Sequence, residues 1–366
     1  MTNFRDALLI VRAWIERGSS APLRASIRLT KDLSNGIEQT VTVTSPEAAA
    51  EVVKVWLQDV VDTDRLQEHA DQTGSVDGNR QAGHSGRAGP GDGAGVLIEQ
   101  LNGIDLYYEA HGEGPRLLYF SGSGADLRTH PNVFDGPFAS QFEVLSHDQR
   151  GLGQTSKPDE TYTMADYAND AAGLLDARGW ESCHVVGVSF GGMVAQEFAL
   201  RFPQRVQCLV LACSCSGGAG GSSYPTHEYF DLSAEEAARR RLEVQDTRCG
   251  AAWQAQHPDE VRAAVTVREA QLESWSANPS ANIGLRRQLE ARWAHDTYDR
   301  LSQLSMPVFI AGGKYDGQAP PANQEVLHRL IPHSTLEFFE GGHTFMRTDP
   351  RAVPRIIEWL SSSVPQ

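Results

Sequence analysis

The chain has 366 residues, and its 32 Lys and Arg against 47 Asp and Glu give a formal net charge of −15 at pH 7. Hydrophobic residues make up 40% and charged residues 22% of the chain, which is the usage of globular proteins and excludes wholesale disorder. An acidic surface repels phosphate backbones and anionic lipid headgroups, so we expect no nucleic-acid partner and no membrane partner.

The cysteine count and the first residues predict a cytoplasmic protein. The sequence has no run of about 18 apolar residues that would span a bilayer. Its apolar start, residues 7–15, is interrupted by Arg12 and is not followed by the small residues of a signal-peptide cleavage site. Five cysteines are an odd number for a disulfide framework, so we expect reduced thiols.

The sequence predicts two folded units joined by a linker. Residues 71–95 carry eight glycines and a single aliphatic residue larger than alanine, Val76. Such a segment buries too little apolar surface to offset the entropy that it would lose on ordering. We therefore predict a small domain at 1–70, a flexible glycine-rich linker at 71–95 and a larger domain at 96–366.

The first unit is predicted to be a small α+β domain with βββα order. Apolar and polar residues alternate at 23–30 and 37–43 around an Asn-Gly turn, and residues 7–15 supply a third strand. Ser-Pro-Glu at 45–47 then opens a helix. No His, Cys or acidic residues cluster there at catalytic spacing, so we interpret the unit as a structural module or a site of homo-oligomer formation. Ligand binding is the alternative.

Strand and helix patterns alternate along the second unit. A β-hairpin at 96–108 comes first. Apolar strands are expected at 116–120, 142–146, 184–187, 206–212, 308–311 and 335–339, and apolar helix stripes at 167–175, 194–202 and 352–360. This alternation is typical of βαβ units, so we predict an α/β fold with a mostly parallel sheet and helices on both faces.

One interval departs from that alternation. Residues from about 215 to 305 carry no strong strand pattern; they begin with a Gly/Ser loop and continue with charged helical stretches. We predict a helical cap over the site, with the loop as its hinge or mouth. Trp253, Trp275 and Trp293 are interpreted as the core of this cap, with pocket lining as the alternative.

Residues 187–191 (GVSFG) form the only G-x-S-x-G pattern in the chain. An apolar strand precedes the pattern and an amphipathic helix follows it, which is the setting of a nucleophile elbow that projects the Ser189 hydroxyl above the sheet edge. The flanking glycines are needed because a Cβ there would collide with neighbouring backbone. The helix N-terminus also favours developing negative charge. We predict that Ser189 is a nucleophile.

A serine hydroxyl needs a base to take its proton, and His343 is the predicted base. It stands between the last predicted strand and the last predicted helix. Asp316 follows the strand at 308–311 and is the predicted acid, which would orient the imidazole and stabilise its charged form. Asp231, which follows the preceding strand, is a weaker candidate for the acid. Glu325 is also weaker, because it has the pattern of a solvated helix residue.

Residues 96–366 resemble the α/β-hydrolases. The segments 148–156 (DQRGLGQTS), 187–191, 312–316 (GGKYD) and 342–343 (GH) stand at the positions where that family has its motifs. The order Ser189, Asp316, His343 is the order of the family's catalytic triad. More narrowly, residues 287–292 (RQLEAR) and 294–301 (AHDTYDRL) resemble hydrolases often labelled 3-oxoadipate enol-lactonase-like.

The resemblance also implies where an oxyanion would be held. An oxyanion hole needs two donors aimed at the position where charge develops. One is the backbone amide of Phe190, and by resemblance the other is that of Ser123. Many family members have His-Gly where this chain has Ser121-Gly122. A backbone donor survives that change, although loop packing and substrate preference would differ.

The predicted chemistry is hydrolysis of a small carboxylic ester or lactone through an acyl-enzyme, with no cofactor and no metal. By resemblance, haloalkane dehalogenases and epoxide hydrolases carry Asp at the elbow, whereas this chain has Ser189. A C–C bond hydrolase and a cofactor-free perhydrolase use the same triad, so both stay open. A third alternative is a non-catalytic binding protein, but a binding module has no need of all three residues.

Overall fold

The structure is a computed structural model that describes residues 8–15, 23–30, 39–43, 53–54, 97–277 and 279–362. The chain divides into two compact units, residues 1–92 and 93–366. Of the helices in the described segments, none is long and apolar enough to cross a membrane.

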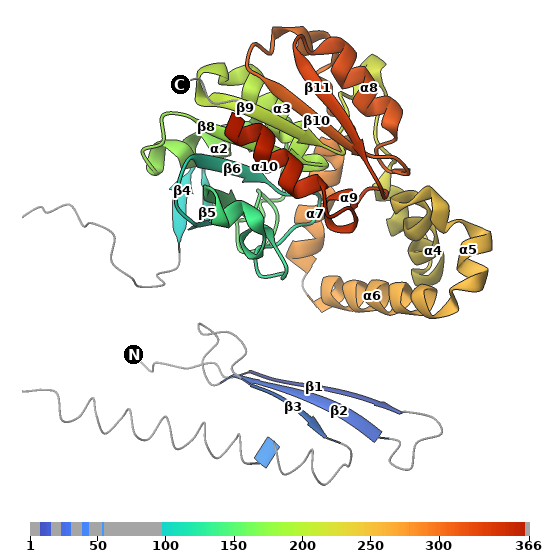
Figure 1. Ribbon diagram of the computed structural model, residues 1–366. Helices are drawn as coiled ribbons and strands as arrows, with labels where there is room; N and C mark the ends of the chain where they lie inside the picture. Colours follow the sequence, from blue (N-terminus) through green and yellow to red (C-terminus); the bar gives the residue numbers. More distant parts are fainter. Residues whose placement is uncertain are drawn as a thin grey trace, which may run out of the picture. The chain divides into compact units, whose positions relative to one another are not determined.

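The N-terminal unit contains an antiparallel sheet of three strands in the order β1-β2-β3 (Figure 1). The strands are β1 (Leu8–Ile15), β2 (Leu23–Thr30) and β3 (Gln39–Val43). They agree with the predicted strands to within about two residues. Val53 and Lys54 are helical, while the rest of the predicted helix and the whole predicted linker lie outside the described residues.

The second unit is built on an eight-stranded sheet in the order β11-β10-β9-β8-β6-β7-β5-β4. The strands are β4 (Ile98–Leu101), β5 (Ile104–His111), β6 (Arg116–Phe120), β7 (Glu143–His147), β8 (Cys183–Val188), β9 (Val206–Ala212), β10 (Val308–Gly313) and β11 (Ser334–Phe339). The strands from β6 to β11 pair in parallel, and β4 and β5 join antiparallel at one edge. The mostly parallel sheet predicted from the sequence is therefore confirmed.

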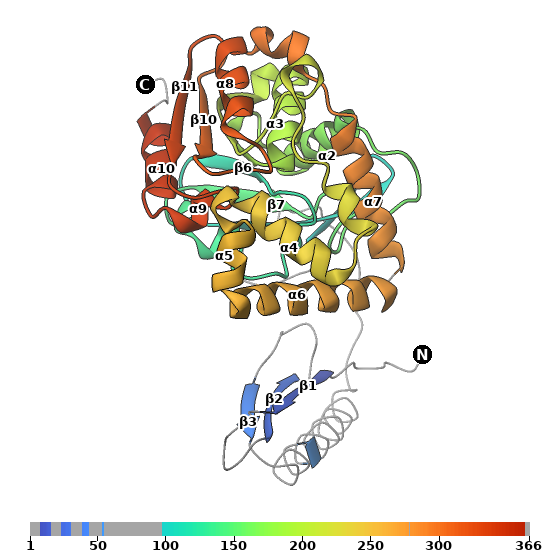
Figure 2. The same cartoon turned by 90° about the vertical axis from the view of Figure 1, so that its right-hand side faces the viewer.

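Helices cover both faces of this sheet (Figures 1 and 2). They are α2 (Met164–Ala177), α3 (Phe190–Arg201), α8 (Pro321–Leu330), α9 (Phe345–Thr348) and α10 (Ala352–Ser362). Alternate residues of each strand serve opposite cores, as β9 shows: Leu209 and Leu211 pack with α2 and α3, whereas Val210 packs with α10. Since both faces are covered, the central strands are almost wholly apolar.

The predicted cap is present as a group of helices between β9 and β10 (Figure 2). They are α4 (Ala234–Gln245), α5 (Ala251–Gln256), α6 (Pro258–Ala277) and α7 (Pro279–Trp293). Short 3₁₀ helices connect the elements at Val133–Asp135, Pro137–Ser140, Pro203–Arg205, Gly218–Gly220, Thr226–Phe230, Thr247–Cys249 and Tyr298–Gln303. Within the described part of this interval, the only β pairing is an isolated bridge between Gly217 and Asp296.

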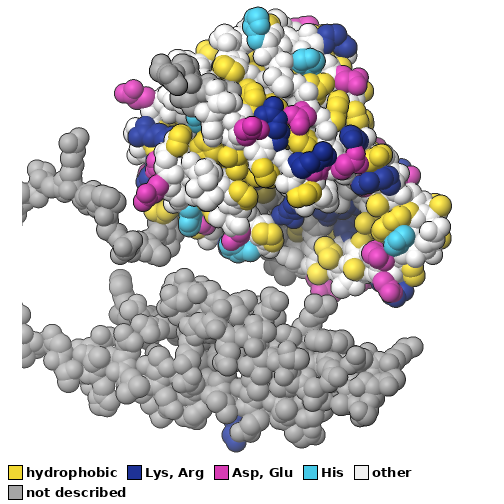
Figure 3. Space-filling model, viewed as in Figure 1, with side chains coloured by type: hydrophobic (Ala, Val, Ile, Leu, Met, Phe, Trp, Pro, Cys, Tyr) yellow, Lys and Arg dark blue, Asp and Glu magenta, His cyan; other side chains and the backbone are white. Residues whose placement is uncertain are grey.

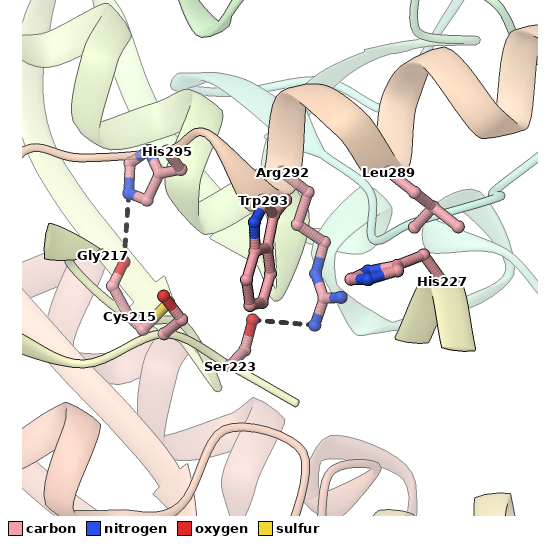
Figure 4. Close-up of a pocket in the computed structure, with 9 residues that line it drawn as sticks. Cys215, Gly217, Ser223, His227, Leu289, Arg292, Trp293 and His295 are labelled. Carbon is pink, nitrogen blue, oxygen red and sulfur yellow. Dashed lines mark hydrogen bonds between the residues drawn. The ribbon is translucent and has the colours of Figure 1, made fainter. Parts of the chain in front are cut away.

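Buried polar contacts join the end of α7 to the loop after β9 (Figure 4). The Arg292 guanidinium donates to the hydroxyls of Ser223 (2.8 Å) and Thr226 (2.6 Å). The ring of His295 donates from Nε2 to the Cys215 carbonyl oxygen at 3.2 Å. The cavity among these side chains has only about 10 Å³, so it cannot admit an ester substrate. We interpret this cluster as an anchor of the cap.

The interpretation of the three tryptophans as cap core is wrong for two of them. Trp293 is 58% exposed and contacts His227 edge-on. Trp275 lies on the wall of a large cavity. Trp253 is half-buried and stacks on His257, with 4.1 Å between ring centroids. Spacing along a helix does not tell the inner face of a cap from its packed face, because both are apolar.

Candidate active site

The turn that joins β8 to α3 carries Ser189 in a strained conformation. Its φ is 56° and its ψ is −115°, which non-glycine residues rarely adopt outside constrained sites. A Cβ added at Gly187 would lie 2.4 Å from the Gly191 carbonyl oxygen, and one at Gly191 would lie 2.1 Å from that of Phe120. The two glycines therefore let the strand, the turn and the helix approach closely enough to form the elbow.

The structure brings Ser189, His343 and Asp316 into one chain of hydrogen bonds. Ser189 Oγ lies 2.9 Å from His343 Nε2, and His343 Nδ1 lies 2.8 Å from Asp316 Oδ2. With its proton on Nδ1, the imidazole donates to the carboxylate and accepts from the hydroxyl. The three residues come from the ends of β8, β10 and β11, which run in parallel and end at one edge of the sheet.

Asp316 is held by more than the histidine. The residue is 2% exposed, and its Oδ1 accepts hydrogen bonds from the amides of Gln318 and Ala319, each at 2.8 Å. These amides fix the rotation of the carboxylate, so that Oδ2 faces His343. The other candidate acids are not part of this arrangement, because Asp231 and Glu325 are both exposed and neither bonds to His343.

Gln318 is a neighbour of His343 that the sequence reasoning missed. Its side-chain Nε2 lies 2.8 Å from His343 Nε2. The amide group therefore donates to the same lone pair that accepts the Ser189 proton. A glutamine two residues after the predicted acid has no motif of its own, and only the fold brings it beside the imidazole.

The two predicted oxyanion donors lie beside Ser189. Phe190 begins α3, and Ser123 lines the same cavity as Ser189. Among the backbone hydrogen bonds that the described residues make in turns, loops and helix ends, none has the amide of Phe190 or Ser123 as its donor. The loop that carries Ser123 is tied at two points: Gln149 donates to the Ser121 carbonyl oxygen, and the Gly124 amide donates to Gln288 of α7, at 2.8 and 2.9 Å.

A cavity of about 620 Å³ opens between Ser189 and the cap. Apolar side chains make up much of its cap wall, and they are Phe230, Leu242, Val267, Trp275, Leu285 and Leu289. Ser189, His343 and Gln318 form part of its floor. Its size and lining are those of a site for a small organic molecule.

A second cavity, of about 460 Å³, is lined in part by the loop that carries Ser121. It shares Gly122, Gly124, Val188 and His343 with the first. His343 therefore borders both cavities, whereas Ser189 borders only the first.

Three other histidines, His147, His184 and His295, are buried without charge. Burial lowers the pKa of His147 and that of His295 to about 4, and it also lowers the pKa of His184. The neutral form therefore prevails in each at pH 7, as expected for structural histidines.

The donor atoms of Cys213, Asp316 and His343 lie within 4.8 Å of one another, close enough to hold a metal ion. Burial raises the pKa of the Cys213 thiol well above its ordinary value, which keeps the sulfur protonated and makes it a poor ligand. Asp316 and His343 already bond to each other. The cluster therefore fits the hydrogen-bonded arrangement better than a metal centre.

Comparisons with known proteins agree with this fold. The family model of the alpha/beta hydrolase fold matches residues 115–350. A protein from Variovorax paradoxus that is named as carbamate hydrolase RutD is 30% identical over 264 residues, which cover 70% of this chain and 97% of that protein. The 3-oxoadipate enol-lactonase 2 from Acinetobacter baylyi is 24% identical over 257 residues, which cover 70% of this chain and 92% of that protein.

A solved structure shows the same architecture. The enol-lactonase from Burkholderia xenovorans matches with a TM-score of 0.57 at 20% identity, over 73% of this chain and 99% of that chain. Family match, relatives and sheet topology point the same way: the chain belongs to the alpha/beta hydrolase fold family.

Proposed function

We propose that this protein is a serine hydrolase that cleaves a small carboxylic ester or lactone through a covalent acyl-enzyme. The observation that carries the proposal is the chain of hydrogen bonds from Ser189 through His343 to Asp316 at the floor of the 620 Å³ cavity. A serine hydroxyl next to a neutral imidazole that is itself oriented by a carboxylate is the arrangement that activates oxygen for acyl transfer.

In the first half of the reaction, Ser189 Oγ attacks the carbonyl carbon while its proton moves to His343 Nε2. The carbonyl oxygen becomes an oxyanion that accepts hydrogen bonds from the amides of Phe190 and Ser123. Asp316 stabilises the imidazolium that has formed. The oxyanion then re-forms the carbonyl, the C–O bond to the leaving group breaks, and His343 gives its proton to the departing oxygen.

In the second half, water replaces the leaving group. His343 Nε2 takes a proton from the water, and the resulting hydroxide attacks the acyl carbon. The bond to Ser189 Oγ breaks, and His343 returns the proton to the serine. The products are a free acid and the regenerated enzyme; for a lactone, the leaving alcohol stays attached to that acid.

The test is hydrolysis of a panel of p-nitrophenyl esters, lactones and vinylogous diketones by the wild type and by Ser189→Ala. We expect the wild type to cleave esters or lactones and the variant to lose at least about 10³-fold in kcat/KM. Ser222→Ala, which changes an exposed serine outside the cavity, is the matched control and should keep full activity. Full ester hydrolysis by Ser189→Ala would contradict the proposal, and cleavage of diketones alone would replace it with C–C hydrolysis.

A further inference from the structure

The cap wall of the 620 Å³ cavity carries positive charge without acidic partners. Arg241 of α4 and Arg268 of α6 both line the cavity, and no Asp or Glu is among its described lining residues. Figure 3 shows Lys and Arg side chains in the recess between the cap and the rest of this domain. This is unusual in a chain in which 47 acidic residues outnumber 32 basic ones.

Arg268 is buried and has only neutral partners. The residue is 8% exposed, and its guanidinium donates to Gln271 Oε1 (2.9 Å) and to the Tyr229 carbonyl oxygen (2.8 Å). Its Nε is buried without a hydrogen-bond partner, and the guanidinium carbon lies 4.9 Å from the centre of the Trp275 ring. Burial and the charge of Arg241 both lower the pKa of Arg268. The positive charge of Arg268 is therefore buried without a negatively charged partner.

Two other arginines of the cap differ from this pair, and Arg292, which is also buried among neutral partners, does not line this cavity. Arg239, two positions before Arg241 on the same helix, forms an ion pair with Glu235 at 2.9 Å. Arg287 of α7 pairs with Asp159 at 2.7 Å and with Glu290 at 2.8 Å. A buried guanidinium without a carboxylate is costly for the fold, so its place on a substrate cavity calls for an anionic ligand.

A third group on the same wall is also unsatisfied. The hydroxyl of Tyr229 is buried without a hydrogen-bond partner, and Tyr229 lines the cavity. Burial raises the pKa of this phenol, so it keeps its proton and remains available as a donor. Arg241, Arg268 and Tyr229 therefore offer donors, and no competing carboxylate, to a bound anion.

We propose that the substrate carries a carboxylate at a distance from its scissile carbonyl, and that Arg241, Arg268 and Tyr229 of the cap bind this carboxylate. The inference rests on the proposed function and narrows its substrates to monoanionic esters or lactones. The carboxylate fixes one end of the substrate on the cap while the reacting carbonyl lies at Ser189, and the apolar wall between them contacts the connecting chain.

The test compares anionic with neutral substrates of the same shape. Mono-p-nitrophenyl esters of linear dicarboxylic acids of increasing length are assayed beside the same compounds with the distal carboxylate methylated. We expect the best anionic ester to have a kcat/KM about 10- to 100-fold above that of its methylated partner, as befits charge-assisted hydrogen bonds. In Arg268→Gln and Arg241→Gln that preference should fall to a few-fold or disappear, mainly through KM, while hydrolysis of the neutral ester is retained.

Two further variants make the result specific. Arg239→Gln removes an equal charge from the same helix but outside the cavity, and it should keep the preference. Arg268→Lys keeps the positive charge but loses the planar, forked guanidinium, so it should keep part of the preference for the anionic ester. An equal loss for anionic and neutral esters in Arg268→Gln would mean that Arg268 only supports the cap, and it would overturn the inference.

Binding to Ser189→Ala, measured by calorimetry, separates this inference from the proposed function. If the anionic ester binds at least about 10-fold more tightly than the neutral one, the protein binds the carboxylate even if it does not hydrolyse the ester. If the wild type hydrolyses both esters equally and Ser189→Ala binds them equally, the carboxylate site is refuted and the proposed function stands.

Discussion

The geometry at Ser189 depends on residues that have no side chain. Gly191 is needed because β6 passes directly behind the elbow, where its backbone oxygens occupy the space of any Cβ. The strain at Ser189 is stored in that turn, and the packing of α3 on β6 and β8 maintains it. The small size of the neighbouring glycines thus positions Ser189 as much as its hydrogen bonds do.

Gly191→Ala should therefore damage both the fold and the site. The new methyl group would meet the backbone of Phe120 and Ser121, which cannot move without shifting β6. We expect a loss of more than about 2 kcal/mol in the free energy of unfolding. Urea denaturation is the measurement. Gly250→Ala is the control, since a Cβ at Gly250 meets nothing within 4 Å, and a loss there as large as at Gly191 would refute the steric explanation.

At the scale of elements, the loop after β7 is fixed to α2 by a buried ion pair. Arg150 donates to Asp170 through Nε and Nη2, both at 2.9 Å, and the two side chains are 6% and 1% exposed. Asn102 of the β4–β5 turn also donates to Asp170. The Asp170 carboxylate thus links α2 to the β4–β5 turn and to the loop after β7, which are distant from it in sequence.

Removing one partner of this pair should be far worse than removing a surface pair. Asp170→Ala leaves the buried Arg150 with only a 3.4 Å contact to the exposed Glu160, and we expect a cost of about 3–5 kcal/mol in unfolding free energy. Asp159→Ala breaks the more exposed contact with Arg287 and should cost much less. Equal losses in the two variants, measured by urea denaturation, would show that burial of the pair does not govern its contribution.

The sequence predicted the elements well and the cavity poorly. The strands at 116–120 and 206–212 match the structure residue for residue, because apolar runs in a parallel sheet are continuous and bounded. The positions of Ser189, Asp316 and His343 at strand ends were predictable for the same reason. Arg241, Arg268 and Gln288 were not, because their directions depend on how the cap helices turn and pack.

At the scale of the whole molecule, buried neutral histidines link stability to pH. Burial lowers the pKa of His147 and His295 from 6.5 to about 4. Below pH 6.5 these two histidines become protonated in the unfolded chain but stay neutral in the folded protein. The stability that these residues contribute is thus complete above pH 6.5 and is lost as the pH falls towards 4, at up to about 3 kcal/mol each.

Urea denaturation at pH 7 and pH 5 tests this linkage. Wild type should lose stability between the two pH values, and His295→Gln should lose about 2 kcal/mol less over the same interval. His333→Asn changes an exposed histidine and should follow the wild type. A pH dependence in His295→Gln that equals the wild type's would show that His295 does not stay neutral in the fold.

Covalent labelling tests whether Ser189 is an activated nucleophile. The full-length protein and its Ser189→Ala variant are incubated with a fluorophosphonate, and their intact masses are measured by mass spectrometry. We expect one adduct on the wild type and none on the variant, because only a serine next to a general base and an oxyanion hole reacts. A folded wild type that stays unlabelled, or a variant that still carries the adduct, would contradict this expectation.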